Sequence, residues 1–143
     1  MTRSVSILGV TGSIGQSTIQ VIEELRGQGH EFPVEAVTAA SRVDALAEAC
    51  RRLKPKFAAI ADPSLLSAAK TALAGLGVEV GAGPSALEEA GARPAEWVMS
   101  AIVGAAGLAP TMAAVRRGAH VALANKECLV CAGPLFIEAA KTH

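Results

Sequence analysis

The 143-residue chain lacks net charge, a long apolar run and an even number of cysteines, and each absence excludes a class of protein. Thirteen basic residues balance thirteen acidic ones, so no basic field indicates nucleic acid as a partner. The apolar stretch 101–109 is interrupted by glycines and ends at Pro110, far short of the roughly 20 residues that cross a membrane. Three cysteines cannot form a closed disulfide framework, and the first residues lack a signal-peptide pattern. We therefore expect a cytoplasmic protein with no membrane partner.

A second pair of metal ligands is also missing. Cys128 and Cys131 have the spacing of a metal or redox half-site, but His30, His120 and His143 are scattered along the chain. A structural zinc ion needs four such ligands, so this pattern argues against one. We interpret the two cysteines as buried or half-buried thiols at the start of a helix.

The segments that are present alternate between strand-like and helix-like patterns, without a linker or a repeat. We expect strands at 5–8, 32–38, 57–61, 78–80, 97–103 and 120–124, and helices at 16–25, 43–53, 63–75, 85–91, 110–117 and 135–141. Ser85 is the expected cap of its helix, and the apolar run 121–124 indicates a strand buried on both faces. The pattern predicts one α/β domain over 1–143: a Rossmann-like, doubly wound, mainly parallel sheet with helices on both faces.

Three glycines spaced three apart connect the first predicted strand to the first predicted helix. They are Gly9, Gly12 and Gly15, and the segment that contains them reads GVTGSIG. Glycines at such a turn let a pyrophosphate approach the free N–H groups and the positive dipole end of the helix. An ordinary tight turn is the alternative, but the flanking strand and helix favour a nucleotide-phosphate site.

The loop after the second strand lacks a carboxylate, which is the residue type that binds the ribose hydroxyls of NAD. Glu35 lies at the other end of that strand, whereas Ser41 and Arg42 can bind a 2′-phosphate. The sequence therefore favours NADP over NAD. The alternative for Arg42 is a solvated residue at a helix start.

Two further strand ends have unusual composition. Small residues over 100–108 suit the close approach of a nicotinamide ring, or else tight helix packing. Asn125, Lys126 and Glu127 follow a predicted apolar strand and form a candidate ligand-facing cluster. The alternative for them is a helix cap followed by a surface charge pair.

Three motifs together resemble one known family. The glycine turn 9–15, the segment 101–108 and the segment 122–127 are similar to the amino-terminal domain of 1-deoxy-D-xylulose 5-phosphate reductoisomerase, and the likeness runs from Val5 to the end of the chain. The resemblance implies an NADPH-dependent oxidoreductase of isoprenoid biosynthesis by the methylerythritol phosphate pathway. Such an enzyme rearranges 1-deoxy-D-xylulose 5-phosphate and reduces it to 2-C-methyl-D-erythritol 4-phosphate. It also implies a divalent metal, Mg or Mn, and a homodimeric full-length enzyme.

The resemblance assigns roles to individual residues. It implies Thr11, Gly12, Ser13 and Ile14 for the dinucleotide phosphates, Ser41 and Arg42 for the 2′-phosphate loop, Asn125 and Glu127 for NADPH, and Lys126 for the substrate. The chain departs from the family at Ala40, where glycine is frequent, at Ser100, where alanine is common, and at Cys128, where serine is usual. Because Ser100 and Cys128 are small, we expect modest effects there.

The family's acidic metal ligands and catalytic loop would lie beyond His143, and no acidic cluster replaces them. Residues 23–24 and 88–89 are pairs of adjacent glutamates on predicted helices. Adjacent side chains on a helix do not converge on one site. We expect the isolated chain to bind NADPH without turnover and to contain no metal ligand. Two alternatives stay open: another NADP-dependent dehydrogenase domain, such as that of a semialdehyde dehydrogenase, and a non-catalytic nucleotide-sensing module.

Overall fold

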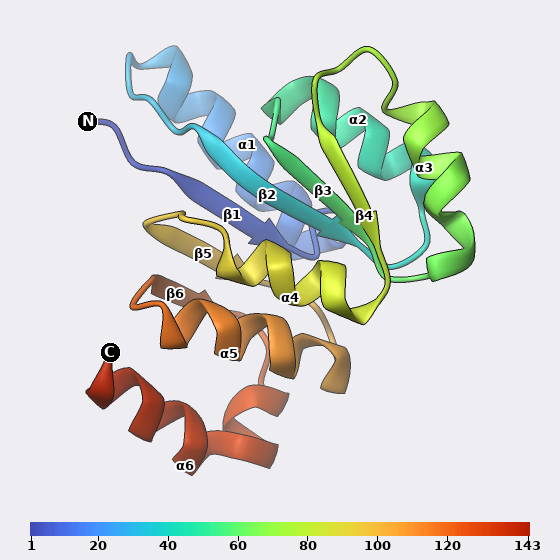
Figure 1. The fold of residues 1–143 in the computed structure, drawn as a ribbon. Coiled ribbons are helices and arrows are strands. Elements are labelled where there is room, and N and C mark those ends of the chain that lie inside the picture. Colours follow the sequence, from blue (N-terminus) through green and yellow to red (C-terminus); the bar gives the residue numbers. More distant parts are fainter.

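The computed structural model describes residues 1–143 and contains one sheet with helices between its strands (Figure 1). The strands are β1 (Val5–Leu8), β2 (Val34–Ala39), β3 (Phe57–Ile60), β4 (Glu79–Ala82), β5 (Trp97–Ser100) and β6 (His120–Leu123). The helices are α1 (Ser13–Gly27), α2 (Val43–Leu53), α3 (Leu66–Ala72), α4 (Pro84–Ala92), α5 (Leu108–Arg116) and α6 (Glu127–Thr142). Short 3₁₀ turns, η1 (Pro63–Leu65) and η2 (Ala105–Gly107), precede α3 and α5.

The strand order is β4-β3-β2-β1-β5-β6, and every neighbouring pair is parallel. The chain moves outward from β1 to β4 on one side and then returns to place β5 beside β1 on the other. The order therefore reverses between β1 and β5, and ligands of doubly wound sheets bind outside the carboxyl ends of strands at such a point.

Helices cover both faces of the sheet, as the sequence predicts. Ile19 of α1 and Leu46 of α2 pack with Ile7 of β1 in one buried cluster. Leu87 of α4 packs with Leu8 and the other inward residues of the second face. Alternate residues of β1 thus enter opposite cores, because successive side chains of a strand point to opposite faces. The predicted Rossmann-like fold is confirmed.

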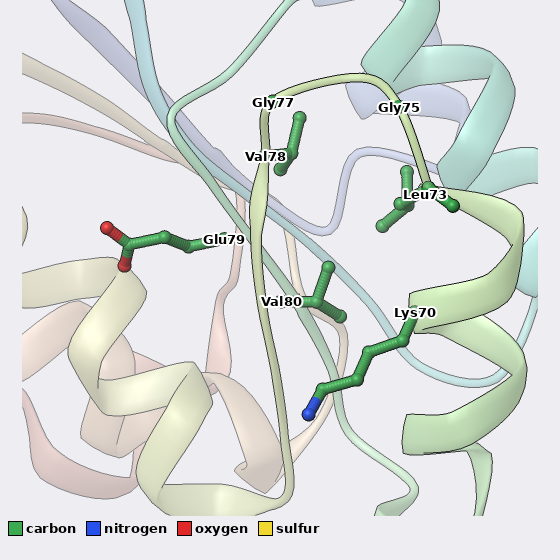
Figure 2. A pocket seen from close by; sticks show the side chains of 8 residues that line it. Lys70, Leu73, Gly75, Gly77, Val78, Glu79 and Val80 are labelled. Carbon is green, nitrogen blue, oxygen red and sulfur yellow. The ribbon is translucent and has the colours of Figure 1, made fainter.

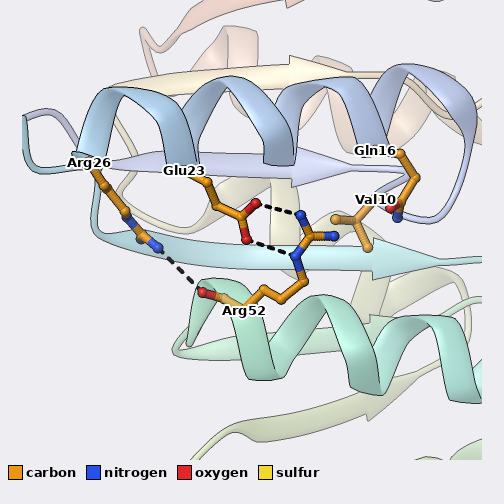
Figure 3. Close-up of polar contacts among 5 residues, drawn as sticks. All are labelled: Val10, Gln16, Glu23, Arg26 and Arg52. Carbon is orange, nitrogen blue, oxygen red and sulfur yellow. Dashed lines mark hydrogen bonds and ion pairs between the residues drawn. The ribbon is translucent and has the colours of Figure 1, made fainter. Parts of the chain in front are cut away.

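Polar contacts join the ends of α1 and α2 (Figure 3). Glu23 accepts two hydrogen bonds from Arg52, at 2.7 Å from Nε and 2.5 Å from Nη2, and this ion pair lowers the pKa of the Glu23 carboxyl. Arg26 donates to the carbonyl of Phe32 at 2.6 Å and to that of Leu53 at 3.4 Å. A guanidinium therefore satisfies a carbonyl at the end of α2, which the helix itself leaves without a partner.

The last helix begins earlier than predicted. The sequence suggests a start at Leu135 because Gly133 and Pro134 break helical patterns, but α6 begins at Glu127. The helix tolerates the proline by a kink, with Ala132 at φ −139° and ψ 23°. The interpretation of the two thiols is half right: Cys128 is buried in the first turn, whereas Cys131 is exposed.

Two other local predictions are wrong. The apolar run of β6 does not mark a strand buried on both faces, because β6 is an edge strand whose residues are half-buried or exposed. Ser85 does not cap α4: the helix begins at Pro84 after Gly83, and no side chain accepts a capping hydrogen bond. The proline supplies a fixed φ at the first helical position instead.

The strand predicted over 97–103 ends at Ser100, and the remaining residues form a loop that leads into η2. The hydroxyl of Ser100 is buried and lies 2.6 Å from that of Thr111 on α5. This pairing explains how a serine is accommodated at the end of a buried strand. The loop that follows borders the site described next.

Candidate functional site

The turn between β1 and α1 is held by its neighbours at the carboxyl edge of the sheet. The N–H of Gly9 donates to Oγ1 of Thr38 at 2.8 Å, and the N–H of Val10 donates to the carbonyl of Thr38 at 2.8 Å. Gly9 has φ +88°, and a Cβ there would lie 2.7 Å from the carbonyl oxygen of Ala101. A Cβ on Gly15 would lie 2.3 Å from the carbonyl oxygen of Gly9. The fold itself therefore requires glycine at both positions.

Gly12 differs from the other two glycines because the fold does not need it. Its φ is −77°, and a Cβ there would meet only the carbonyl oxygen of Gly9, at the ordinary contact distance of 3.8 Å. The following N–H groups, of Ser13, Ile14 and Gly15, have no hydrogen-bond acceptor within the chain. The start of α1 thus offers orphan donors, a positive dipole end and space, which together suit a phosphate.

Sequence reasoning missed two side chains that shape this turn. Thr38 is a buried residue of β2 whose hydroxyl accepts from the N–H of Gly9. Gln16 of α1 donates to the carbonyl of Val10 at 3.0 Å, and Figure 3 labels Val10 and Gln16. The available signal was a threonine near the carboxyl end of the second predicted strand, whose other polar residue, Glu35, lies at the opposite end. These two side chains satisfy the N–H of Gly9 and the carbonyl of Val10, so both polar groups are unavailable to a ligand.

A cavity of about 170 Å³ opens beside the turn, between the carboxyl ends of β1, β2 and β5. One wall carries Thr38, Ala39 and Ala40, and the other comes from the loop after β5. The full lining is Gly9, Thr11, Thr38, Ala39, Ala40, Ala61, Leu87, Ile102, Val103 and Ala106. Small apolar side chains next to a phosphate-binding turn are typical of a nucleotide site.

Ser41 and Arg42 are exposed and lie between β2 and the start of α2. The guanidinium of Arg42 forms no ion pair or hydrogen bond within the chain. Glu35 lies near the opposite end of β2, where its carboxylate pairs with Lys56 at 2.7 Å. A phosphate at this end of the strand would therefore meet an arginine that forms no ion pair within the chain.

The segment 125–127 follows β6 and begins α6. Asn125 is only 3% exposed, and its Oδ1 accepts from the N–H of Glu127 at 2.9 Å. Its Nδ2 donates to the carbonyls of Ile102 and Gly104, at 2.5 and 3.1 Å. Lys126 is exposed and forms no ion pair. The segment thus lies at the same edge of the sheet as the glycine turn, with its amide committed to the protein.

Other hollows and clusters offer less chemistry. A hollow of about 460 Å³ lies between α3 and β4 (Figure 2), but Glu79 points out of it and pairs with Arg93 at 2.5 Å. No group of three or more histidine, cysteine or acidic side chains is arranged to hold a metal ion, and no helix is long and apolar enough to cross a membrane. The candidate site is therefore the edge bordered by the glycine turn.

The reversed strand order and the phosphate-suited turn define a Rossmann-type nucleotide-binding domain. The sequence model of the 1-deoxy-D-xylulose 5-phosphate reductoisomerase family matches residues 5–133. This match includes the glycine turn, the loop after β5 and the start of α6. The chain belongs to the 1-deoxy-D-xylulose 5-phosphate reductoisomerase family.

Individual relatives agree with the family assignment. The 1-deoxy-D-xylulose 5-phosphate reductoisomerases of Rhodopseudomonas palustris (strain BisB18) and Afipia carboxidovorans are each 57% identical to the chain, over 138 and 141 residues. These alignments cover 96% and 99% of the chain but 33% and 34% of the relatives. The chain therefore spans about a third of the length of the curated relatives it matches.

Solved structures of relatives show the same fold. The reductoisomerase of Zymomonas mobilis, solved in complex with NADPH, is 50% identical and superposes with a TM-score of 0.95, over 100% of this chain and 37% of that one. A reductoisomerase solved with NADPH, fosmidomycin and magnesium is 38% identical with a TM-score of 0.91, over 99% and 34% of the two chains.

Proposed function

We propose that this chain holds NADPH for the reductoisomerase reaction of its family. One observation carries the proposal: the start of α1 presents three backbone N–H groups without acceptors, beside a glycine that the fold does not require. The first N–H groups of any helix can bind water, but beside a glycine turn at the carboxyl edge of a doubly wound sheet they suit an anionic group. The NADPH bound in the Zymomonas mobilis relative supplies the identity of that group.

Each predicted residue has a role within this proposal. Thr11, Gly12, Ser13 and Ile14 surround the pyrophosphate at the start of α1, where backbone donors are unpaired. Ser41 and Arg42 bind the 2′-phosphate through a hydroxyl and a planar fork of donors. Asn125 and Glu127 contact NADPH, and Lys126 contacts the substrate.

The proposed reaction converts 1-deoxy-D-xylulose 5-phosphate into 2-C-methyl-D-erythritol 4-phosphate. NADPH, when bound, supplies the hydride for the reduction of the rearranged carbon skeleton. The residues of this chain orient the cofactor, and the exposed ammonium of Lys126 attracts the anionic substrate. The apolar cavity wall excludes water from the cofactor.

The proposal includes the wider context of the family. We place the reaction in the cytoplasm, in a homodimer that uses Mg or Mn, with no nucleic acid or membrane partner. The three cysteines are free thiols, which agrees with a reducing compartment. Magnesium is named in three solved structures of relatives, and we assign no ligand for it to residues of this chain.

The test compares NADPH and NADH binding to the chain and to Arg42→Ala. Loss of a charge-assisted contact of about 1.5–3 kcal/mol should weaken NADPH roughly 10- to 150-fold and change NADH little. Arg51→Ala is the matched control, because Arg51 lies on the same helix and pairs with Glu48 at 3.2 Å. The emission of the cofactor is the appropriate signal, because Trp97 stacks on His120 at the amino ends of β5 and β6, away from the turn.

The result distinguishes the parts of the proposal. Equal weakening of NADPH and NADH by Arg42→Ala would contradict the 2′-phosphate assignment. Failure of the unaltered chain to bind either cofactor would overturn the proposed function as a whole.

A further inference from the structure

The most completely bonded polar side chain near the candidate site belongs to Asn125. The amide uses both hydrogens of Nδ2, toward the carbonyls of Ile102 and Gly104, and its Oδ1 accepts from the N–H of Glu127. The side chain is 3% exposed and does not line the cavity beside the glycine turn. Its donors are therefore committed to the protein before any ligand arrives.

These hydrogen bonds join two segments that lie beyond the end of the β5–β6 pairing, which stops at Ser100 and Leu123. Ile102 and Gly104 lie in the loop after β5, whereas Asn125 and Glu127 lie at the start of α6. Residues of the first segment, Ile102, Val103 and Ala106, form one wall of the cavity. Val103 is 87% exposed, and Ile102 is only partly buried against the core, so the tip of this loop has few apolar contacts of its own.

Gly107 supplies an independent sign that this contact is tightly fitted. A Cβ on Gly107 would lie 2.2 Å from Nδ2 of Asn125 and 2.9 Å from the carbonyl oxygen of Ile102. Only glycine leaves room for the amide to reach both carbonyls. The loop and the asparagine are therefore matched in shape as well as in hydrogen bonding.

We propose that Asn125 is a positioning residue that clamps the 102–107 loop to the start of α6 and so fixes one wall of the cofactor cavity. The proposal deepens the proposed function and rests on it for the identity of the ligand. It adds to the contact with NADPH that the family resemblance implies for this residue, because Oδ1 accepts one hydrogen bond within the chain and has a second lone pair.

Three substitutions separate the hydrogen bonds to the loop from the hydrogen bond to the N–H of Glu127. Asn125→Asp keeps an oxygen that accepts from the N–H of Glu127, but it has no hydrogens for the two loop carbonyls. Asn125→Ala removes both functions. Gly107→Ala leaves Asn125 in the sequence and displaces its amide by the added Cβ. If the clamp matters, all three variants should share one effect on the loop.

The first measurement uses the ¹⁵N-labelled chain without cofactor. Backbone order parameters of Val103–Ala106 should fall from about 0.85 to below about 0.6 in all three variants. The start of α6 should stay ordered in Asn125→Asp. An unchanged loop in Asn125→Asp would overturn the proposal. In the unaltered chain, the side-chain amide hydrogens of Asn125 should exchange slowly before NADPH is added; rapid exchange until NADPH binds would also overturn it.

The second measurement compares NADPH with adenosine 2′,5′-bisphosphate, which reproduces only the adenine and 2′-phosphate end of the cofactor. Asn125→Asp should weaken NADPH about tenfold, which corresponds to the loss of about two hydrogen bonds, and leave the bisphosphate unchanged. Equal weakening of both ligands would identify a general stability role and overturn the proposal. If the unaltered chain binds neither ligand, the proposed function fails. The order parameters still test whether Asn125 holds the 102–107 loop, because they are measured without cofactor.

Discussion

Replacement of Gly12 by alanine should separate cofactor binding from folding. The added Cβ would meet only the carbonyl oxygen of Gly9, at 3.8 Å, and the φ of −77° is open to any residue. Gly12 is the N-cap of α1, where glycine is preferred to alanine, and this cost opposes the loss of freedom that alanine causes in the unfolded chain. We expect the two effects to offset each other, with a net change in the free energy of unfolding of no more than about 0.5–1 kcal/mol.

The same substitution should impair the proposed phosphate site. The Cβ occupies the space through which a pyrophosphate reaches the unpaired N–H groups at the start of α1. Loss of one charge-assisted hydrogen bond costs about 1.5–3 kcal/mol, so NADPH should bind roughly 10- to 150-fold more weakly. Gly15→Ala is the contrasting variant, because its Cβ would lie 2.3 Å from the carbonyl oxygen of Gly9. It should destabilise the fold by about 1–3 kcal/mol or more.

Urea unfolding gives the stability of each variant, and titration of NADPH followed by cofactor emission gives the affinity. The expected pattern is a stable Gly12→Ala with weak binding and an unstable Gly15→Ala. The reasoning would be refuted if Gly12→Ala bound NADPH as tightly as the unaltered chain, or if it lost as much stability as Gly15→Ala.

Three further predictions concern stability and reactivity. The buried hydroxyl of Ser6 has no hydrogen-bond partner, so Ser6→Ala should raise the free energy of unfolding by about 1 kcal/mol in urea titrations; a loss of stability would contradict this. The lowered pKa of Glu23 means that its ion pair stabilises the fold above the ordinary value of 4.5 and that this contribution disappears as pH falls through the lower folded-state pKa. Glu23→Gln should therefore be less stable than the unaltered chain at neutral pH, by at most about 1 kcal/mol, and equally stable in acid; a difference independent of pH would rule out the ion pair as its source. Burial raises the pKa of Cys50 to about 12, whereas Cys131 is exposed, so a disulfide thiol reagent should react with the folded chain only at Cys131. Fast reaction that persists in Cys131→Ser would show another accessible thiol.

The sequence allowed the sheet and one half of the site to be predicted, because both depend on local patterns. Apolar strands, helical spacing and the glycine turn are encoded within short windows around Gly9–Gly15 and Val34–Ala39. The role of Arg42 was predicted from its place directly after the second predicted strand. These features need only the knowledge that parallel strands end at the same edge.

The other half of the site depends on contacts that no local pattern reveals. The approach of Gly107 to Asn125, and that of Gly9 to Ala101, join residues from different loops. Likewise, the early start of α6 could not be predicted, because Pro134 indicated a break and the kink at Ala132 absorbs it. The effect of a proline on a helix is local, so the sequence pattern shows it. The packing of α6 against α5 is a tertiary contact, which no sequence pattern shows.

The walls of the cavity come from three distant parts of the chain, around Gly9, Thr38 and Val103. None of them meets another until β1, β2 and β5 have paired, so the unfolded chain contains no partial version of the site. Any ligand held there binds only the assembled sheet, and its binding energy adds to the stability of every strand that borders the cavity. The midpoint of thermal unfolding therefore becomes a measure of cofactor concentration, and a cell that runs short of the cofactor also weakens the scaffold that binds it.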